Sequence, residues 1–145
     1  MAELTVGPVE ELPPGEVKIV RAGELAIGVY NLKGSYYAIE RYERDLLDYA
    51  LPKLEAAEGV RVFGPSADRR AGIVSFEVEG AHPHDVAQVL DWEGVAVRAG
   101  HHCNQPLMAK LGVPATTRAS FYLYTVPEEI DRLVAGIEKA RKVFS

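Results

Sequence analysis

The chain has 145 residues, of which 48% are apolar, enough for one ordinary globular domain or two very small ones. Its formal net charge is −5 and its acidic and basic residues are interspersed, so it offers no basic stripe for nucleic acid and no polybasic tail for an anionic membrane. Because no apolar run approaches the roughly 20 residues of a membrane span and the first residues do not resemble a signal peptide, we expect a cytoplasmic protein with no nucleic acid or membrane partner.

The first 40 residues favour β-strands. Runs of β-prone residues at 16–20, 25–31 and 35–39 alternate with turn signals at 22–23 and 33–34, which predicts an antiparallel meander. A few strands with one uncovered face bury little surface, so we expect the apolar side to pack on the sheet of the remaining chain or on a second copy. The unpaired strand edges favour a homodimer. The candidate packing residues are Val17, Ile19, Ile27 and Val29.

From residue 42 onward, apolar residues recur at three- and four-residue spacing, which predicts a helix that Pro52 should kink or end early. Strands with interleaved helices and short connections then predict an α+β fold, in which the meander is joined to an α/β sandwich. The expected elements are strands at 60–63, 72–78, 95–98 and 115–124, and helices at 83–92, at 105–111 and from Pro127 onward. Alternation along the strand at 72–78 places Val74, Phe76 and Val78 on one face. In the strand at 115–124, one face carries Arg118, Ser120, Tyr122 and Tyr124, and the other face carries Ala119, Phe121 and Leu123.

Cys103 is the only cysteine of the chain, and a helix start follows it directly. Asn104 is a plausible N-cap, and Pro106 suits the first helical turn. Nearby cations and a helix N-terminus both favour the thiolate, and Arg98, His101 and His102 lie within five residues. The sequence therefore predicts a nucleophilic cysteine. The alternative is a small buried apolar side chain, since free cysteine is often buried.

Two further groups of polar residues are candidates for binding. Arg118 lies on a predicted strand among polar residues, where its planar guanidinium suits a carboxylate; the alternative is an ordinary surface arginine. A metal site built from histidines and Cys103 is conceivable, but the residue spacings typical of zinc sites are absent. For the pair at 82 and 84 the alternative is helix-start polarity around a proline. The histidines are His82, His84, His101 and His102.

Three segments carry a resemblance to a known family. They are Gly-Ala-His-Pro-His-Asp-Val at 80–86, Gly-Val-Ala-Val-Arg-Ala-Gly-His-His-Cys-Asn-Gln-Pro-Leu-Met at 94–108, and Thr-Arg-Ala-Ser-Phe-Tyr-Leu-Tyr at 117–124. With them, residues from about 43 to 144 resemble the C-terminal small domain of a SufS-type cysteine desulfurase, a branch of the class V aminotransferases. The resemblance implies a desulfurase-like domain over residues 41–145 with the family's small-domain α/β sandwich.

The resemblance also implies site residues. The cysteine that matches Cys103 attacks the sulfur of substrate cysteine and leaves as a persulfide, which passes to an acceptor protein. The arginine matching Arg118 holds the substrate carboxylate, and Arg98 and His102 match positions that line the same pocket. The family binds pyridoxal phosphate through a lysine of a large N-terminal domain that has no counterpart in this sequence. No cofactor-binding residue therefore carries over, and we expect no turnover of free cysteine by this chain alone.

Residues 4–40 are similar to the opening strands of a Rieske-type ferredoxin. In that family a Cys-x-His ligand pair would come next, but Arg41-Tyr42-Glu43 stands there instead. A Rieske [2Fe–2S] centre needs two cysteines and two histidines, so one cysteine cannot supply its ligand set. We therefore expect a truncated Rieske-like meander at 1–40 joined to the desulfurase-like domain, as a natural fusion or a chimera.

Two functions are compatible with these expectations. The first is a partial cysteine-desulfurase-like domain that accepts or relays persulfide sulfur on Cys103 for iron–sulfur cluster assembly. Its partner would be a sulfur-acceptor protein or a complete desulfurase. The alternative is a non-catalytic structural or partner-binding module without activity.

Overall fold

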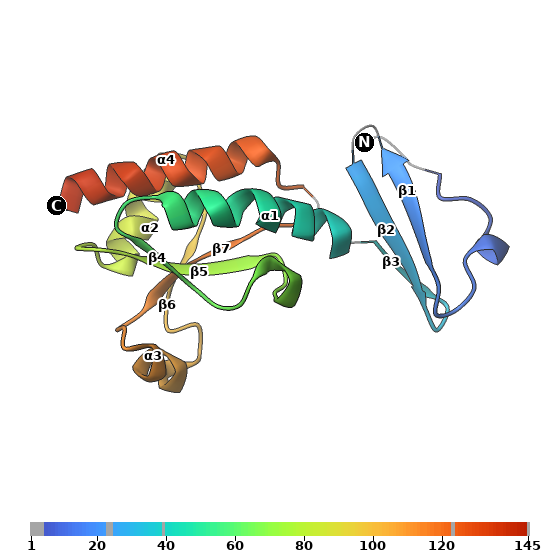
Figure 1. The fold of residues 1–145 in the computed structure, drawn as a ribbon, viewed down its shortest axis with the longest axis horizontal. Helices are drawn as coiled ribbons and strands as arrows, with labels where there is room; N and C mark the ends of the chain where they lie inside the picture. The colour runs from blue at the N-terminus through green and yellow to red at the C-terminus, as the bar shows by residue number, and fades with distance from the viewer. Residues whose placement is uncertain (1–4, 23–24, 39, 123, 145) are drawn as a thin grey trace.

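The fold contains two separate antiparallel sheets (Figure 1). A computed structural model describes residues 5–22, 25–38, 40–122 and 124–144. The first sheet is three-stranded and belongs to the N-terminal part, and the second is four-stranded and carries the helices. This arrangement confirms the predicted α+β class.

The N-terminal sheet is the predicted meander. Its strands β1 (Val17–Ala22), β2 (Leu25–Leu32) and β3 (Ser35–Ala38) pair in chain order. Lys33 and Gly34 join β2 to β3 with φ values of 54° and 89°, the sign pattern of the tight turn whose twist suits a hairpin. Gly23, expected in the first turn, lies outside the described residues.

The register of β1 on β2 separates the four residues expected to share one apolar side. Val17 lies opposite Tyr30, and Ile19 lies opposite Gly28, so both belong to one face. Ile27 and Val29 belong to the other face, since residues next to each other along a strand point in opposite directions. Val17 and Ile19 are 46% and 52% exposed, whereas Val29 is buried. The prediction of a single apolar side was wrong.

The buried face of the meander is covered by the chain that precedes it. Leu12, just after the short 3-10 turn η1 (Val9–Glu11), is 3% exposed. The Asn31 side-chain amide of β2 donates a hydrogen bond to the Leu12 carbonyl at 2.7 Å. The main hydrophobic cluster contains no described residue of the meander, so the expected packing on the second sheet is not found. Pairing with a second copy remains a prediction.

The larger unit begins with α1, whose N-terminal end lies beside the meander and which contacts β2 (Figure 1). The second sheet is antiparallel throughout and has the order β4-β5-β7-β6. Figure 1 shows α1, α2 and α4 on one face of this sheet and the short α3 beyond its other side. The elements are α1 (Glu40–Ala56), β4 (Val60–Phe63), η2 (Ala67–Arg69), β5 (Ile73–Val78), α2 (Pro83–Trp92), β6 (Arg98–Gly100), α3 (Gln105–Leu111), β7 (Thr116–Ser120) and α4 (Pro127–Phe144).

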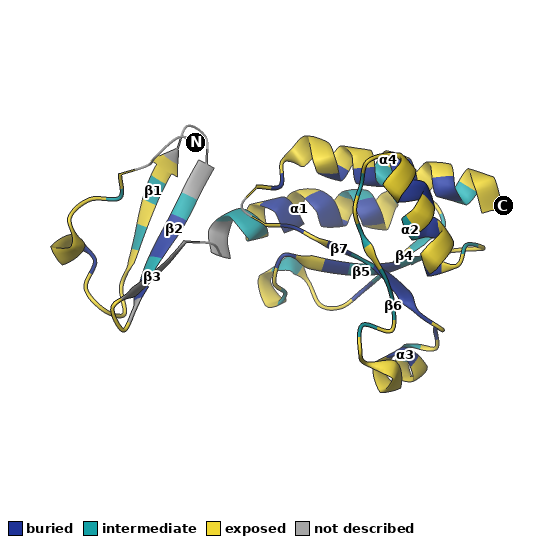
Figure 2. Ribbon diagram, turned by 180° about the vertical axis from the view of Figure 1, so that it is seen from behind, coloured by how far each residue is buried: buried dark blue, intermediate teal, exposed yellow. Residues whose placement is uncertain are grey.

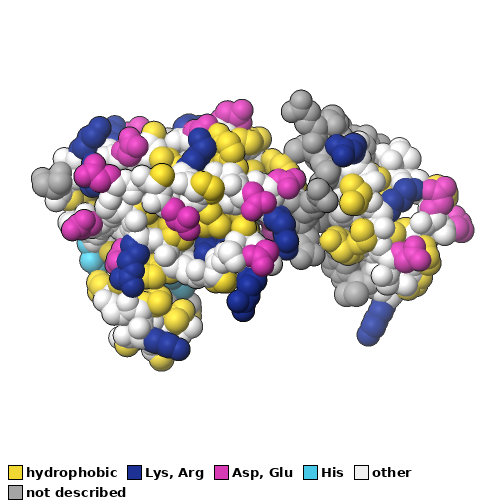
Figure 3. Space-filling model, viewed as in Figure 1, with side chains coloured by type: hydrophobic (Ala, Val, Ile, Leu, Met, Phe, Trp, Pro, Cys, Tyr) yellow, Lys and Arg dark blue, Asp and Glu magenta, His cyan; other side chains and the backbone are white. Residues whose placement is uncertain are grey.

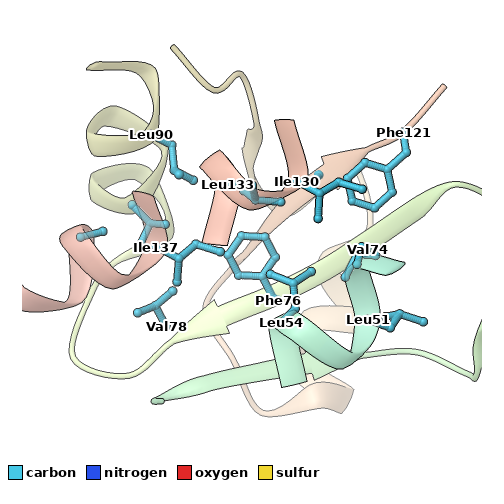
Figure 4. Packing of buried hydrophobic residues seen from close by; sticks show 14 of the residues in the cluster. Leu51, Leu54, Val74, Phe76, Val78, Leu90, Phe121, Ile130, Leu133 and Ile137 are labelled. Atoms are coloured by element: carbon cyan, nitrogen blue, oxygen red, sulfur yellow. The ribbon is translucent and has the colours of Figure 1, made fainter. Parts of the chain in front are cut away.

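The hydrophobic core lies between the second sheet and its three helices (Figure 4). Phe76 of β5 is fully buried at its centre, and Val74 and Val78 are buried beside it on the same face, as predicted. From α4, Ile130, Leu133 and Ile137 form the buried stripe. Figure 2 shows burial concentrated on the facing sides of these helices and strands. The core therefore leaves the opposite face of the sheet for other uses.

Three expected elements differ from the structure. Helix α1 continues through Pro52 to Ala56 instead of breaking early. Pro52 lacks the N–H that would bond the carbonyl of Asp48, but both residues are exposed, so water can satisfy that carbonyl. Strand β6 begins at Arg98 and not at residue 95, because the Val95 N–H is used to close α2 by bonding the Leu90 carbonyl at 2.9 Å.

Strand β7 ends at Ser120, so Tyr122 and Tyr124 do not extend its face as expected. The chain leaves the sheet because the Tyr122 N–H donates to the Thr125 hydroxyl at 3.0 Å. Ala119 and Phe121 are buried as expected, while Leu123 lies outside the described residues.

Charged side chains of both signs are interspersed over the face of the molecule drawn in Figure 3. Among the described residues, no helix has the length and apolar character needed to cross a membrane.

Candidate functional site

A row of side chains crosses the face of the second sheet that lies opposite α1, α2 and α4 (Figure 1). The registers place Phe63 of β4 opposite Ser75 of β5, Ser75 opposite Arg118 of β7, and Arg118 opposite Arg98 of β6. Paired residues project to the same side, and this side is opposite to the one that buries Phe76. The sheet thus brings two arginines that are 20 positions apart in the sequence to one place.

Arg98 and Arg118 are direct cross-strand neighbours, and like charges in that position repel. Arg98 is exposed, whereas Arg118 is half-buried and its Nε atom is buried without a hydrogen-bond partner among the described residues. A carboxylate between them would relieve the repulsion and accept the unused N–H. The arrangement is compatible with binding of an anion, and Arg118 is half-buried with a second arginine opposite it.

Cys103 lies in a tight turn that follows β6. The Asn104 N–H donates to the His101 carbonyl at 2.9 Å, and the two residues between them, His102 and Cys103, have φ values of 53° and 61°. Left-handed backbone is unfavourable for residues with a Cβ, and such strain is typical of functional segments. Cys103 is exposed, so the alternative of a buried apolar cysteine is wrong.

The short helix α3 starts directly after this turn, as predicted. Asn104 is its N-cap, with the side-chain oxygen accepting a hydrogen bond from the Leu107 N–H at 3.3 Å. Pro106 lies in the first turn, and Gly112 ends the helix in the left-handed conformation, with φ of 73°. Met108 is buried with Phe63 and Val113 in a small cluster of its own, which attaches α3 to the edge of the sheet.

The His102 ring turns inward from the exposed segment. Its Nε2 lies 3.1 Å from the Thr116 hydroxyl and 3.2 Å from the Thr116 carbonyl, while its Nδ1 is buried without a partner among the described residues. Burial lowers the pKa of His102 below its usual value. The backbone hydrogen bond at Thr116 opposes that shift, and the charges of Arg118, Arg98 and His101 add to it. His102 is therefore neutral near pH 7.

A cavity of about 340 Å³ lies on this face of the sheet. His102 and Arg118 line it, whereas Cys103, which lies in the sequence between the lining residues His102 and Asn104, does not. Arg98, which was expected in the pocket, does not line it either. The other lining residues, none of which the sequence singled out as functional except His101, are Phe63, Gly64, Ile73, Ser75, His101, Leu107, Met108, Leu111 and Thr116.

The residues that line the cavity do not suit pyridoxal phosphate. Pyridoxal phosphate requires a lysine amine for its Schiff base and an acidic partner for its ring nitrogen. No lysine, aspartate or glutamate lines the cavity, so the lining residues do not fit the cofactor. Within the described ranges, no three His, Cys, Asp or Glu side chains group closely enough to hold a metal ion.

His82 and His84 have a structural role at the start of α2. His82 is the N-cap, and its Nδ1 accepts a hydrogen bond from the His84 N–H at 3.3 Å. The two rings stack with centroids 5.4 Å apart. The structure confirms the alternative given for this pair, in which the two histidines are polar residues at the start of a helix.

The family model that describes class V aminotransferases matches residues 17–133. The chain belongs to the class V aminotransferase family. Among curated members, it is 51% identical over 108 residues to a probable cysteine desulfurase of Staphylococcus aureus strain Mu50, and 57% identical over 106 residues to one of Halalkalibacterium halodurans. These matches cover 74% and 73% of this chain and 26% of each relative. The chain thus spans about a quarter of the length of these family members.

Solved structures agree with this membership. The fold matches the apo structure of a cysteine desulfurase from Thermococcus onnurineus NA1 with a TM-score of 0.68 and 43% identity, over 72% of this chain and 26% of that one. A cysteine desulfurase of Escherichia coli, CsdA in an S-sulfonic acid form, matches with a TM-score of 0.67 and 34% identity, over 73% and 26%. Most of this chain therefore has the fold of part of a cysteine desulfurase.

The family match also extends into the meander. It begins at residue 17, within β1. A probable cysteine desulfurase of Staphylococcus epidermidis is 44% identical over 132 residues, 90% of this chain and 32% of that protein. That length exceeds residues 41–145, so the similarity includes part of the first 40 residues.

Proposed function

We propose that this chain is the sulfur-handling small domain of a cysteine-desulfurase-like protein, and that Cys103 accepts persulfide sulfur. The observation that carries the proposal is the position of the only cysteine, exposed on a strained turn between His102 and Asn104, two residues that line a cavity together with Arg118. Nucleophilic thiolates occur in partly exposed surroundings of this cationic kind. The similarity to cysteine desulfurases supports the same assignment.

The proposed step is thiol–disulfide exchange and needs no cofactor of this chain. The Cys103 thiolate attacks the terminal sulfur of a donor persulfide, a new S–S bond forms on Cys103, and the donor's S–S bond breaks. The donor leaves as a thiolate and can take up the proton that Cys103 lost, so there is no net oxidation or reduction. The sulfur held on Cys103 would then pass to an acceptor, with iron–sulfur cluster assembly as its use.

Arg118 and Arg98 would bind the anionic part of the donor. Their cross-strand pairing and the unused Arg118 Nε support capture of a carboxylate beside the thiol. His102 would line the binding pocket for the donor beside Arg118. Because the cavity has no lining amine or carboxylate, we expect no release of sulfide from free cysteine by this chain alone.

Several further assignments are part of the proposal. We divide the chain at residue 40 into the meander and a desulfurase-like domain of the SufS type, with the meander as a truncated Rieske-like segment. The partner would be a complete desulfurase or a sulfur acceptor in the cytoplasm, and the strand edges of the meander would favour a homodimer. Size measurement in solution and truncation at residue 40 would test these points.

The test is to incubate the purified chain with a complete desulfurase and cysteine, and to weigh it. We expect a gain of one sulfur atom, removed by a reductant and absent in Cys103→Ser. Since the chain has a single cysteine, the mass alone identifies the site. The absence of any gain, or an equal gain in Cys103→Ser, would contradict the proposal and favour a structural or partner-binding module.

A further inference from the structure

The segment that carries Cys103 is held to the sheet by one side chain. Gly100 of β6 lies opposite Thr116 of β7, and this is the last paired position of β6. Two residues later, the ring of His102 comes back to the same Thr116, with Nε2 3.2 Å from its carbonyl oxygen and 3.1 Å from its hydroxyl oxygen. Thr116 is fully buried, so the point of attachment is part of the rigid sheet.

A second attachment lies on the other side of Cys103. Asn104 caps α3, and Met108 of that helix is buried against Phe63 of β4. Cys103 itself is exposed and makes no such contact among the described residues. The position of the thiol is therefore fixed by the attachments of its two neighbours and not by packing of the Cys103 side chain.

The backbone between the two attachments is unfavourable without them. His102 and Cys103 are both left-handed, with φ of 53° and 61°, and the chain has no glycine or asparagine at either position to relieve the strain. The penalty for such residues is similar in size to the net contribution of one hydrogen bond. Loss of the contact between His102 and Thr116 should therefore release the turn.

We propose that His102 and Thr116 form an anchor that positions Cys103, with the His102 ring pinning the strained turn to strand β7. This inference rests on the proposed function, because it explains how the sulfur-accepting thiol is held next to His102 and Asn104, which line the cavity. His102 is in this account a positioning residue: its ring acts on the turn and not on the transferred sulfur.

The protonation state of His102 gives the anchor a signature that simple packing would lack. Two oxygens near Nε2 favour the tautomer with the proton on Nε2, which leaves the buried Nδ1 as an unused acceptor. Protonation would place an N–H at the buried Nδ1, where no acceptor is found among the described residues. The added positive charge would also be repelled by Arg118 on β7, Arg98 on β6 and His101 in the turn itself. Acid should therefore loosen the turn.

The test is hydrogen exchange of the Asn104 amide, which bonds the His101 carbonyl across the turn. Relative to the wild type, His102→Phe keeps a ring but removes both nitrogens, and should lower protection about two- to tenfold, the range for one hydrogen bond. Thr116→Val should have a smaller effect in the same direction, and Thr116→Ser, which keeps the hydroxyl, should restore protection. His101→Phe is the matched control, because the exposed His101 ring has no hydrogen bond to Thr116 among the described residues, so the substitution should not change protection.

The pH dependence is the second readout, corrected for intrinsic exchange. Protection of Asn104 in the wild type should fall in acid, whereas in His102→Phe it should be low and insensitive to pH. Full protection in His102→Phe, or an unchanged acid response, would overturn the anchor whether or not Cys103 takes up sulfur. A wild-type chain that shows the anchor but gains no sulfur would overturn the proposed function and leave the anchor supported.

Discussion

The two sheets of this protein are stabilised in different ways. The second sheet buries Val74, Phe76 and Val78 under three helices, and its core includes residues of α4 from Ile130 to Ala140 (Figure 4). The meander buries one described valine, Val29, together with Leu12 from the preceding segment. Its other face carries Val17 and Ile19, which are about half exposed.

The difference indicates that the second sheet with its helices can be stable by itself, whereas the meander is stabilised mainly by the segment that packs on it. A two-layer unit with a continuous core has the architecture of an independent domain. A sheet of three strands with one covered face is close to the lower limit of independent stability. The turn that carries Cys103 is attached to the first kind of unit, where a rigid scaffold can hold the geometry of a loop.

Removal of the central core side chain should have the largest effect. Phe76→Ala should lower the free energy of unfolding by about 3–5 kcal/mol, because it removes a fully buried ring and leaves a cavity. The measurement is urea denaturation followed by circular dichroism. Ile73→Ala is the matched control on the same strand, since Ile73 is 42% exposed. Similar losses for the two variants would contradict the placement of the core.

A smaller effect is expected for the corresponding change in the meander. Val29→Ala removes two buried carbon groups and should destabilise the meander by about 1–2 kcal/mol. Hydrogen exchange should locate the loss in β1 to β3 and leave β5 and β7 protected. Ile19→Ala on the exposed face should change stability by less than about 0.5 kcal/mol. A loss of protection throughout the second sheet in Val29→Ala would show that the two sheets fold as one unit.

Much of this comparison could be predicted from the sequence, because it depends on local patterns. Alternation predicted the buried face of β5, and three- and four-residue spacing predicted α2 and α4. The pairing of faces in the meander failed because it depends on the register between strands, which a single strand's pattern does not contain. The end of β7 failed because the side chain of Thr125 takes up the Tyr122 N–H.

The site could be predicted only in part, for the same reason. The resemblance and the local charge single out Cys103, Arg98, His102 and Arg118. The structure pairs Arg98 with Arg118 across β6 and β7, and His102 lines the same cavity as Arg118. Thr116 and Ser75 were missed, because a threonine or serine in a strand has no distinctive sequence signal. The strand register aligns Ser75 with Arg118, and the turn after β6 brings the His102 ring to Thr116. Neither position can be read from a single strand's pattern.

Acid should weaken the two units differently, since all four histidines lie beyond residue 40. The folded-state pKa of His102 is lowered by burial, so below about pH 6.5 the unfolded chain binds more protons than the folded chain. This contribution should reduce the stability of the helical unit as the pH falls from about 7 to 5, before most carboxylates titrate. His102→Gln should flatten the decline when denaturation midpoints are compared over this range. An equal decline in both proteins would remove His102 as the cause.

The smallest effect is expected at the contact between α1 and α4. Lys53 lies 2.8 Å from Asp131, and the Tyr49 hydroxyl lies 3.1 Å from both carboxylate oxygens. The hydrogen bond with Lys53 lowers the pKa of Asp131, so the carboxylate is ionised at neutral pH. Asp131→Asn should slightly lower the melting temperature at low salt, and the difference should disappear at high salt. Asp48→Asn, an exposed carboxylate of α1 outside this contact, is the control and should change neither value.

The most direct test of the central claim is transfer of labelled sulfur in a single turnover. A complete desulfurase is loaded with radiolabelled sulfur from cysteine, freed of excess substrate, and mixed with an equal amount of this chain. We expect the label to move from the desulfurase to Cys103 of the wild type, and we expect no label on Cys103→Ser, which has no other cysteine. Label that stays on the desulfurase, or that reaches the wild type and Cys103→Ser equally, would contradict the claim that Cys103 accepts the sulfur.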